Sequence, residues 1–197
     1  MAVASVALDR ARAMMNDRLA AIWTDAILMP FLDISFQEAQ AWLRKSKSPF
    51  MKVTSPAQVV LAGAVVVGAA LTDLVEPIRV WAGPSSLATS SLLEEVSFIP
   101  QVSATTTLKF WSWTGGAINL LGATTDQNVY VHYWKNFATP ASGAGSLVIP
   151  AIENYIAPKI ASLAMASVGQ DSLSAVMAAM GLERMEEVVS ANRGAAR

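Results

Sequence analysis

The sequence predicts an α+β protein: a small helical bundle from N- and C-terminal helices with a central antiparallel β lobe. Two observations predict this class. Helix-forming residues with few breakers fill both ends of the chain, whereas the middle has alternating apolar and aromatic residues between Gly-rich turns. Helices from distant ends of one chain most simply pack together, with the sheet as an adjoining lobe. We expect one composite domain, made of an N-terminal helical hairpin (1–48), a β-rich lobe (49–137), and a linker with C-terminal helices (138–197).

The composition favours a chain that associates with other chains. Apolar residues make up 53% of the 197 residues and charged residues 15%, against about 25% charged in an average globular domain. This composition excludes an intrinsically disordered chain and leaves few polar groups to cover the surface of a monomer. We therefore expect part of the apolar surface to be buried against other copies or partners. The net charge of −1 excludes the global basic field of a nucleic-acid-binding protein.

The N-terminal region predicts two helices. Ala, Arg, Met and Leu dominate residues 6–21, and a second helix is expected to start at the N-cap Thr24, with Asp25 favourable in its first turn. Pro30 is expected to kink this second helix or to mark its true start, and Pro49 to end it. Its predicted core face consists of Ile27, Phe31, Ile34 and Trp42, widened by Leu28 and Ala39.

The middle of the chain predicts strands joined by tight turns. One hairpin is expected to join 58–61 to 64–67 through Ala62-Gly63, and a second to join 108–113 to 117–121 through the Thr114-Gly115-Gly116 turn. A further strand is expected at 77–81. The last strand, 128–136, is predicted to place Val129, Val131 and Tyr133 on one face and Tyr130, His132 and Trp134 on the other.

The C-terminal region predicts a plain linker and two helices. Residues 138–146 are rich in Ala, Ser and Gly and are expected to form a flexible connector. Pro150 suits the first turn of a helix with a kink at Pro158, for which the apolar positions are Ile152, Tyr155, Ile156, Ile160 and Leu163. Gly169 is expected to end it and Asp171 to cap a second helix, with Leu173, Val176, Met177 and Met180 on one side and a frayed tail at 192–197.

Groups that could perform chemistry are few and scattered. The chain has no cysteine, which excludes disulfides, thiolate catalysis and cysteine-built zinc sites, and its one histidine is His132. A histidine between aromatic residues on a strand is typical of a surface or hydrogen-bonded position. The adjacent pairs Glu94-Glu95 and Glu186-Glu187 direct their side chains apart in regular structure. We expect no catalytic residue, no cofactor and no metal site, which leaves an enzyme of unrecognised type as a minor alternative.

Two clusters have a structural and a functional interpretation. The cations Arg44, Lys45, Lys47 and Lys52 suit a helix C-terminus, or form a basic patch that faces DNA in a channel if an oligomer repeats them. The aromatic residues are typical of core packing and cross-strand contact. A carbohydrate-binding β domain would use Trp111, Trp113, Tyr130 and Trp134.

No membrane segment or secretory signal is predicted. The most apolar stretch, Val59–Leu71, has 13 residues, whereas a spanning helix needs about 20. Its valine content favours buried strands. The N-terminal apolar stretch stops at Asp9, before it is long enough for a signal peptide. We expect a soluble chain.

The order of the segments resembles that of head–tail connector proteins of tailed bacteriophages, the adaptors that sit under the portal. The stretch Leu8–Asp17, followed by Ile22–Leu28, resembles their first helix, Asn-Asp loop and Trp-Thr-Asp start of the second helix. Asp73–Trp81 is similar to the strand that follows. Trp111–Ile118 resembles their β hairpin, and the Ala-rich Ile152–Val189 resembles their C-terminal helical pair.

This resemblance implies a structural virion protein without catalysis. Connector subunits form a ring that matches the twelvefold symmetry of the portal, extend the DNA channel and anchor the tail or nozzle protein. The expected partners are copies of this chain, the portal, a tail or nozzle protein and genomic DNA in transit, in a neck assembled in the host cytoplasm. The portal contact is expected at Glu183, Arg184, Glu187, Arg193 and Arg197. A tail-completion, nozzle or capsid-associated virion protein is the nearest alternative.

Replacing Trp111 or Trp113 with Ala is expected to lower the melting temperature of the subunit, because a large-to-small change in a core removes buried apolar area and leaves a cavity. Thermal unfolding followed by circular dichroism tests this. An unchanged melting temperature together with lost oligosaccharide binding would place these residues on a ligand surface instead.

Overall fold

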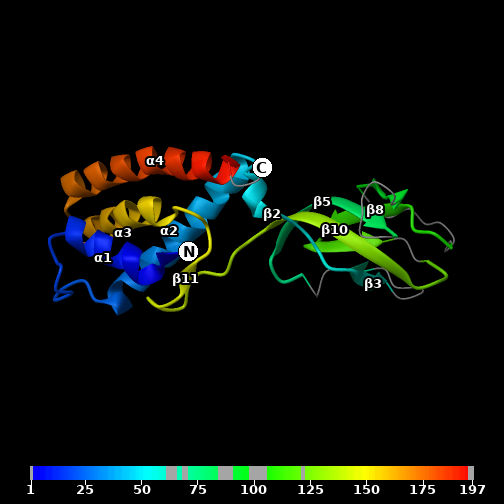
Figure 1. Ribbon diagram of the computed structural model, residues 1–197, viewed down its shortest axis with the longest axis horizontal. Helices are drawn as coiled ribbons and strands as arrows, with labels where there is room; N and C mark the ends of the chain where they lie inside the picture. The colour runs from blue at the N-terminus through cyan, green and yellow to red at the C-terminus, as the bar shows by residue number, and fades with distance from the viewer. Residues whose placement is uncertain are drawn as a thin grey trace. The chain divides into compact units, whose positions relative to one another are not determined.

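The α+β class predicted from the sequence is confirmed by the computed structural model. It describes residues 2–60, 66–67, 71–83, 91–97, 106–120 and 123–194, of which the side chains of 66–67, 91 and 193–194 are outside the description. The chain divides into a helical unit, Met1–Met51 with Phe137–Arg197, and a β unit, Lys52–Asn136 (Figure 1). Segments from both ends of the sequence thus build one helical unit.

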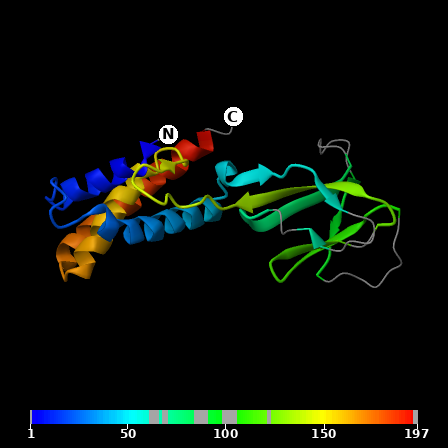
Figure 2. The ribbon, with the colours of Figure 1, turned by 90° about the horizontal axis from the view of Figure 1, so that it is seen from below.

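Helix α3 (Glu153–Ser167) is the centre of the helical unit. Helices α1 (Ala4–Met14), α2 (Asp25–Lys45) and α4 (Asp171–Gly194) all pack against it (Figures 1 and 2). Because α3 has a neighbour on several sides, it is apolar around most of its circumference, as buried helices are. Its buried residues are Tyr155, Ile156, Ala157, Pro158, Ile160, Ala161, Ser162, Ala164 and Met165.

The first helix is shorter than the sequence indicates. Helical residues were expected through 6–21, but α1 ends at Met14 and Asn16 takes a left-handed backbone conformation with φ of 59°. The carboxylate of Asp17 then accepts hydrogen bonds from the backbone N–H groups of Ala21, Ile22 and Trp23 at 2.6–3.0 Å. These local bonds favour a loop over continued helix.

Helix α2 begins where the sequence predicts but buries a different face. Thr24 is its N-cap residue, and the helix continues through Pro30 to Lys45. Of the predicted core face, Leu28 and Ala39 are buried as expected, whereas Ile27, Ile34 and Trp42 are exposed and Phe31 is half-buried. The stripe that faces the core has regular three- and four-residue spacing and consists of Leu28, Leu32, Phe36, Ala39 and Leu43.

Helix α4 shows the same kind of difference. It starts at Asp171 after Gly169, which ends α3 with φ of 74°, as predicted. Of the four residues predicted to share one side of this helix, Leu173, Val176 and Met180 are exposed and Met177 is half-buried. The side that faces the helical core consists of Gly181, Met185, Val188 and Asn192. The tail was expected to fray from 192, but Asn192 is buried and donates a hydrogen bond to the Pro150 carbonyl at 3.1 Å.

The segment after Phe137 is anchored and is not the flexible connector predicted from its composition. The side chain of Gln40 exchanges two hydrogen bonds with the backbone of Phe137, and Thr139 donates one to Asp33 at 2.6 Å. Strand β11 (Ser146–Leu147) pairs with β1 (Ala2–Val3). At Gly145 an added Cβ would lie 2.7 Å from Cβ of Pro140, so glycine is required for this path.

The β unit contains two sheets in the described part of the chain. In one sheet, β10 (Gln127–Lys135) pairs with β2 (Lys52–Thr54), β3 (Gln58–Val60) and β5 (Leu74–Ala82), and β5 pairs with β6 (Ser91–Leu92). In the other sheet, the strand order is β4 (Val66–Val67), β9 (Ala117–Leu120), β8 (Phe110–Thr114) and β7 (Glu94–Glu95). Only β7 and β8 run parallel among the described pairs.

One of the two predicted hairpins is confirmed. Strands β8 and β9 pair through Gly115 and Gly116, whose φ angles of 63° and 76° suit the tight turn that two-residue hairpins favour. The other prediction fails in the described residues: β3 pairs with β10 and β4 with β9, so the segments around Ala62-Gly63 belong to different sheets. Residues 61–65 themselves lie outside the description.

The core of the β unit follows the predicted alternation along β10. Val129, Val131 and Tyr133 are buried, while Tyr130, His132 and Trp134 are half-buried on the opposite face. Trp111 is 2% exposed, and Trp113 packs partly buried against the same cluster. The other buried members are Val60, Leu71, Val80, Ala82, Leu93, Leu108, Ile118, Leu120 and Ala123.

The corrected face of α2 gives a paired prediction. Leu32 is fully buried and Ile34 is 50% exposed on the same helix. Leu32→Ala is expected to reduce the free energy of unfolding by about 2–5 kcal/mol, because a buried cavity forms. Ile34→Ala in dilute protein is expected to stay within about 0.5 kcal/mol of the parent. Urea denaturation of the two variants checks this, and a larger loss for Ile34→Ala would restore the face predicted from the sequence.

Candidate functional site

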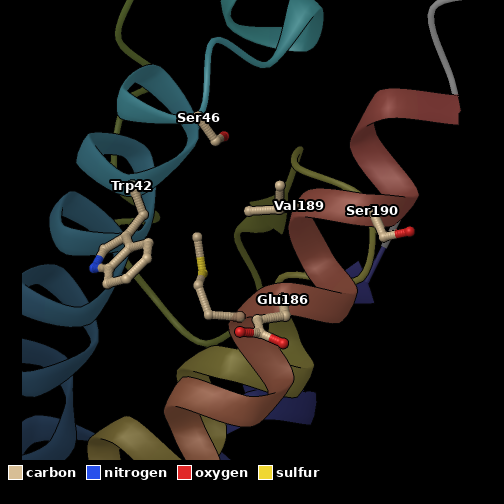
Figure 3. Close-up of a pocket in the computed structure, with 6 residues that line it drawn as sticks. Trp42, Ser46, Glu186, Val189 and Ser190 are labelled. Carbon is tan, nitrogen blue, oxygen red and sulfur yellow. The ribbon is translucent and has the colours of Figure 1, made fainter.

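A groove lies between the C-terminal parts of α2 and α4 in the helical unit (Figure 3). Its volume is about 320 Å³, more than twice that of a cavity of roughly 150 Å³ that accommodates benzene. Trp42, Met185 and Val189 supply apolar lining, and Ser46, Glu186 and Ser190 supply polar groups. Glu186 is exposed. The groove is thus suited to an aliphatic side chain accompanied by a positive charge.

Two apolar stripes on the helical unit have no cover within the described part of the chain. On α2 the stripe contains Ile27, Ile34 and Trp42, spaced so that they share one side of the helix. On α4 the stripe contains Leu173, Val176 and Met180 with equivalent spacing. The α2 residues were predicted to face the core, and the α4 residues were predicted to share one side of their helix. Exposed apolar residues gathered on one side of a helix favour association with another surface.

A third apolar feature is the loop between α1 and α2. Leu19 is 92% exposed and Ile22 is also exposed. Ala20 takes a left-handed conformation with φ of 53°, which is uncommon for a residue other than glycine. Backbone strain of this kind persists where the surroundings impose it, and it gathers at functional positions.

Buried polar contacts hold this loop in place. The guanidinium of Arg12 donates to the Trp23 carbonyl at 2.7 Å, pairs with Asp9 at 2.8 Å and pairs with Asp25 at the start of α2. The carboxylate of Asp17 accepts three backbone N–H groups. The hydrogen bond from Trp23 contributes most to lowering the pKa of Asp17 below its ordinary value of 3.8, and burial opposes this effect. The ionised carboxylate is therefore part of the folded loop.

The predicted basic patch is divided between the two units. Arg44, Lys45 and Lys47 lie at the C-terminal end of α2, while Lys52 is in β2. Burial lowers the pKa of Arg44, and Lys45 lies 5.9 Å from the centre of the Trp42 ring. Lys47 adopts a left-handed conformation at φ of 56°, and the next N–H, of Ser48, bonds to the Leu43 carbonyl at 2.9 Å. The three positive charges lie at the negative end of the helix dipole, and contact with DNA stays a prediction.

The predicted portal contact lies on the outer side of α4. Glu183, Arg184 and Glu187 are exposed, and Arg184 pairs with Glu187 at 2.6 Å. The side chain of Arg193 and all of Arg197 lie outside the described residues. A contact between this segment and a portal stays a prediction.

The residues of the carbohydrate-binding alternative are not on one surface. Trp111 belongs to the core of the β unit, whereas Tyr130 and Trp134 are on the outer face of β10. Nζ of Lys52 lies 4.7 Å from the centre of the Trp134 ring, and Tyr130 stacks with Trp81 at 5.6 Å between ring centroids. A continuous aromatic platform built from all four predicted residues is therefore wrong.

His132 is a surface residue of this same face. Its Nδ1 lies 3.2 Å from Thr54 Oγ1. Partial burial lowers the pKa of His132, and the positive charges of Lys52 and Arg79 lower it further. In the described ranges, no group of three or more His, Asp or Glu side chains is arranged to hold a metal ion.

No protein-family model matches the sequence, and no curated protein is significantly similar to it. Among the helices of the described chain, none has the length and apolar composition that crossing a bilayer requires.

Sequence reasoning missed the groove and the exposed apolar tip of the loop. The groove requires knowing that α2 and α4 converge, which periodicity within each helix does not indicate. The composition assigned Leu19 to the helical range 6–21, and the resemblance placed an Asn-Asp loop at Asn16-Asp17, but neither indicated that Leu19 and Ile22 are exposed. Asp17, six residues before Trp23, is a loop-capping signal that local hydrogen-bonding preferences could have identified.

The charge of Asp17 gives a pH-dependent prediction. Asp17→Asn is expected to lower the free energy of unfolding at neutral pH, because an amide replaces a carboxylate that accepts three N–H groups. Since the folded pKa lies below 3.8, the advantage of the parent is full above that pH and is lost as the pH falls through the folded value. Urea denaturation from pH 7 to pH 2 measures this difference.

Glu183→Gln is the matched control, because Glu183 is an exposed carboxylate on α4. It is expected to leave stability nearly unchanged across the same pH range. A difference between the parent and Asp17→Asn that stays constant down to the lowest pH would contradict the ionised loop carboxylate.

Proposed function

We propose that this chain is a structural ring subunit of a bacteriophage virion, a head–tail connector that performs no reaction. The observation that carries the proposal is the pair of uncovered apolar stripes, on α2 and α4 of the helical unit. They lie on different helices and contain different residues. A ring built from head-to-tail contacts needs two different patches on each subunit.

The energetics favour association of such surfaces. Obligate interfaces bury more than about 2,000 Å² and are more apolar than ordinary surface. Apolar burial is worth about 25 cal/mol per Å² before the costs of association. A chain with 15% charged residues loses few ion–water contacts when such a surface is covered.

The assignment to a connector rests on the resemblance of the segment order. In this proposal the ring is twelvefold, its α4 end contacts the portal, and its other surfaces contact a tail or nozzle protein. The net charge of −1 suits a channel through which genomic DNA passes without being held. A tail-completion, nozzle or capsid-associated protein would use the same stripes in a different assembly.

Two matched variants test the role of the stripe on α4. Val176 is 55% exposed on the stripe, and Val59 is 60% exposed on β3 of the β unit. Val176→Asp is expected to weaken self-association by at least about tenfold, because it places a charge in an apolar interface. Val59→Asp, outside both stripes, is expected to associate like the parent. Light scattering after size-exclusion chromatography measures both.

Two outcomes would count against this role for the stripe. Equal losses for Val176→Asp and Val59→Asp would show that the effect does not depend on the α4 stripe. A melting temperature of Val176→Asp well below that of the parent would show that the residue stabilises the subunit itself instead.

The position of the coding sequence is an independent test of the virion assignment. A connector is expected to be encoded close to a portal gene and a major capsid gene. A neighbourhood of metabolic genes would contradict the bacteriophage assignment. It would not test whether the chain forms a ring.

A further inference from the structure

The loop between α1 and α2 presents an apolar tip on a fixed backbone. Leu19 is 92% exposed, and Arg18 beside it is exposed and has no ion-pair partner among the described residues. The bonds of Asp17 and Arg12 hold the backbone on both sides of this tip. A tip that is already ordered loses little conformational entropy when it docks.

The groove between α2 and α4 has the complementary chemistry. Trp42, Met185 and Val189 offer apolar contact, and the volume of about 320 Å³ has room for a leucine side chain. Glu186 supplies a negative charge at the groove, and it also lacks an ion-pair partner in the described part of the chain. An aliphatic side chain next to a cation therefore matches the volume, the apolar lining and the negative charge of the groove.

The tip and the groove of one copy cannot meet. The loop precedes Asp25 at the start of α2, and Trp42 lines the groove near its end. These positions are 17 residues apart, which corresponds to about 25 Å along a helix at 1.5 Å per residue. Because α2 is a single helix, the two features are held apart.

We propose that the Arg18-Leu19 tip of one copy docks into the α2–α4 groove of the next copy, with Arg18 paired to Glu186. This inference rests on the proposed ring, because it adds a second contact between neighbours to the one that the apolar stripes make. The contact is head-to-tail, so each copy uses its tip on one neighbour and its groove on the other, and the series closes into a ring or continues as a filament.

Charge exchange tests the contact in the full chain. Leu19→Glu is expected to weaken self-association by at least about tenfold, and Arg18→Glu or Glu186→Arg by about threefold to tenfold. The double variant Arg18→Glu/Glu186→Arg is expected to return to within about threefold of the parent, because the pair is restored with opposite polarity. Glu76→Arg, at an exposed carboxylate of β5 outside the groove and the stripes, is expected to associate like the parent.

The outcomes separate this contact from the ring proposal. A parent chain that stays monomeric at every concentration overturns both. A parent that assembles, with Leu19→Glu and the charge variants assembling equally well, overturns the tip-in-groove contact alone. Single reversals that weaken assembly without recovery in the double variant also overturn the pairing of Arg18 with Glu186.

Engineered cysteines give a direct second readout, because the chain has no cysteine of its own. Leu19→Cys combined with Ser190→Cys is expected to form a ladder of linked chains on a denaturing gel after mild oxidation. Disulfides need Cα atoms about 4.4–6.8 Å apart, which excludes a bond within one copy. Each single variant is expected to give at most dimers, and the same limit in the double variant would overturn the contact.

Discussion

The burial of α3 by three neighbouring helices is the constraint on which the rest of the helical unit depends. Because α3 is apolar around most of its circumference, α1, α2 and α4 must each commit one side to it. On α4 this side includes Met185 and Val188, while Leu173, Val176 and Met180 face outward. Helices α2 and α4 thus bury one side against α3 and expose apolar residues on another side. The proposed ring uses these exposed residues as interfaces.

Local polar contacts fix the positions of the packed helices and of the loop before α2. Glu38 Oε2 on α2 accepts hydrogen bonds from Tyr155 at 2.9 Å and Lys159 at 2.8 Å, both on α3. Burial raises the pKa of Tyr155, and its hydrogen bond to Glu38 raises it further, so the phenol stays protonated as a donor. Arg12 and Asp17 play the corresponding part at the loop before α2. Ordered helices and an ordered loop allow an assembly contact to form with little loss of entropy.

The sequence predicted what depends on local signals. It predicted the start of α2 after Thr24, although the side chain of Thr24 makes no capping hydrogen bond. It also predicted the end of α3 at Gly169 and the Gly115-Gly116 hairpin, where the glycines adopt left-handed conformations, and the alternation along β10, which follows a period-two pattern. The prediction failed where one helix has two apolar sides and either of them could face the core. Helix α2 has two apolar stripes, and only the neighbouring helices decide that Leu28 and Leu32 face the core while Ile27 and Ile34 do not. The groove beside Trp42 was missed for the same reason, since it needs α4 to be placed.

The most direct test of the proposed ring is electron microscopy of the purified parent chain over a range of concentrations. If the exposed apolar stripes are interfaces between copies, we expect closed particles with rotational symmetry and one fixed number of copies, in which the helical units contact one another. Particles of a single 20.9-kDa chain at every concentration, without association, would contradict this role of the stripes.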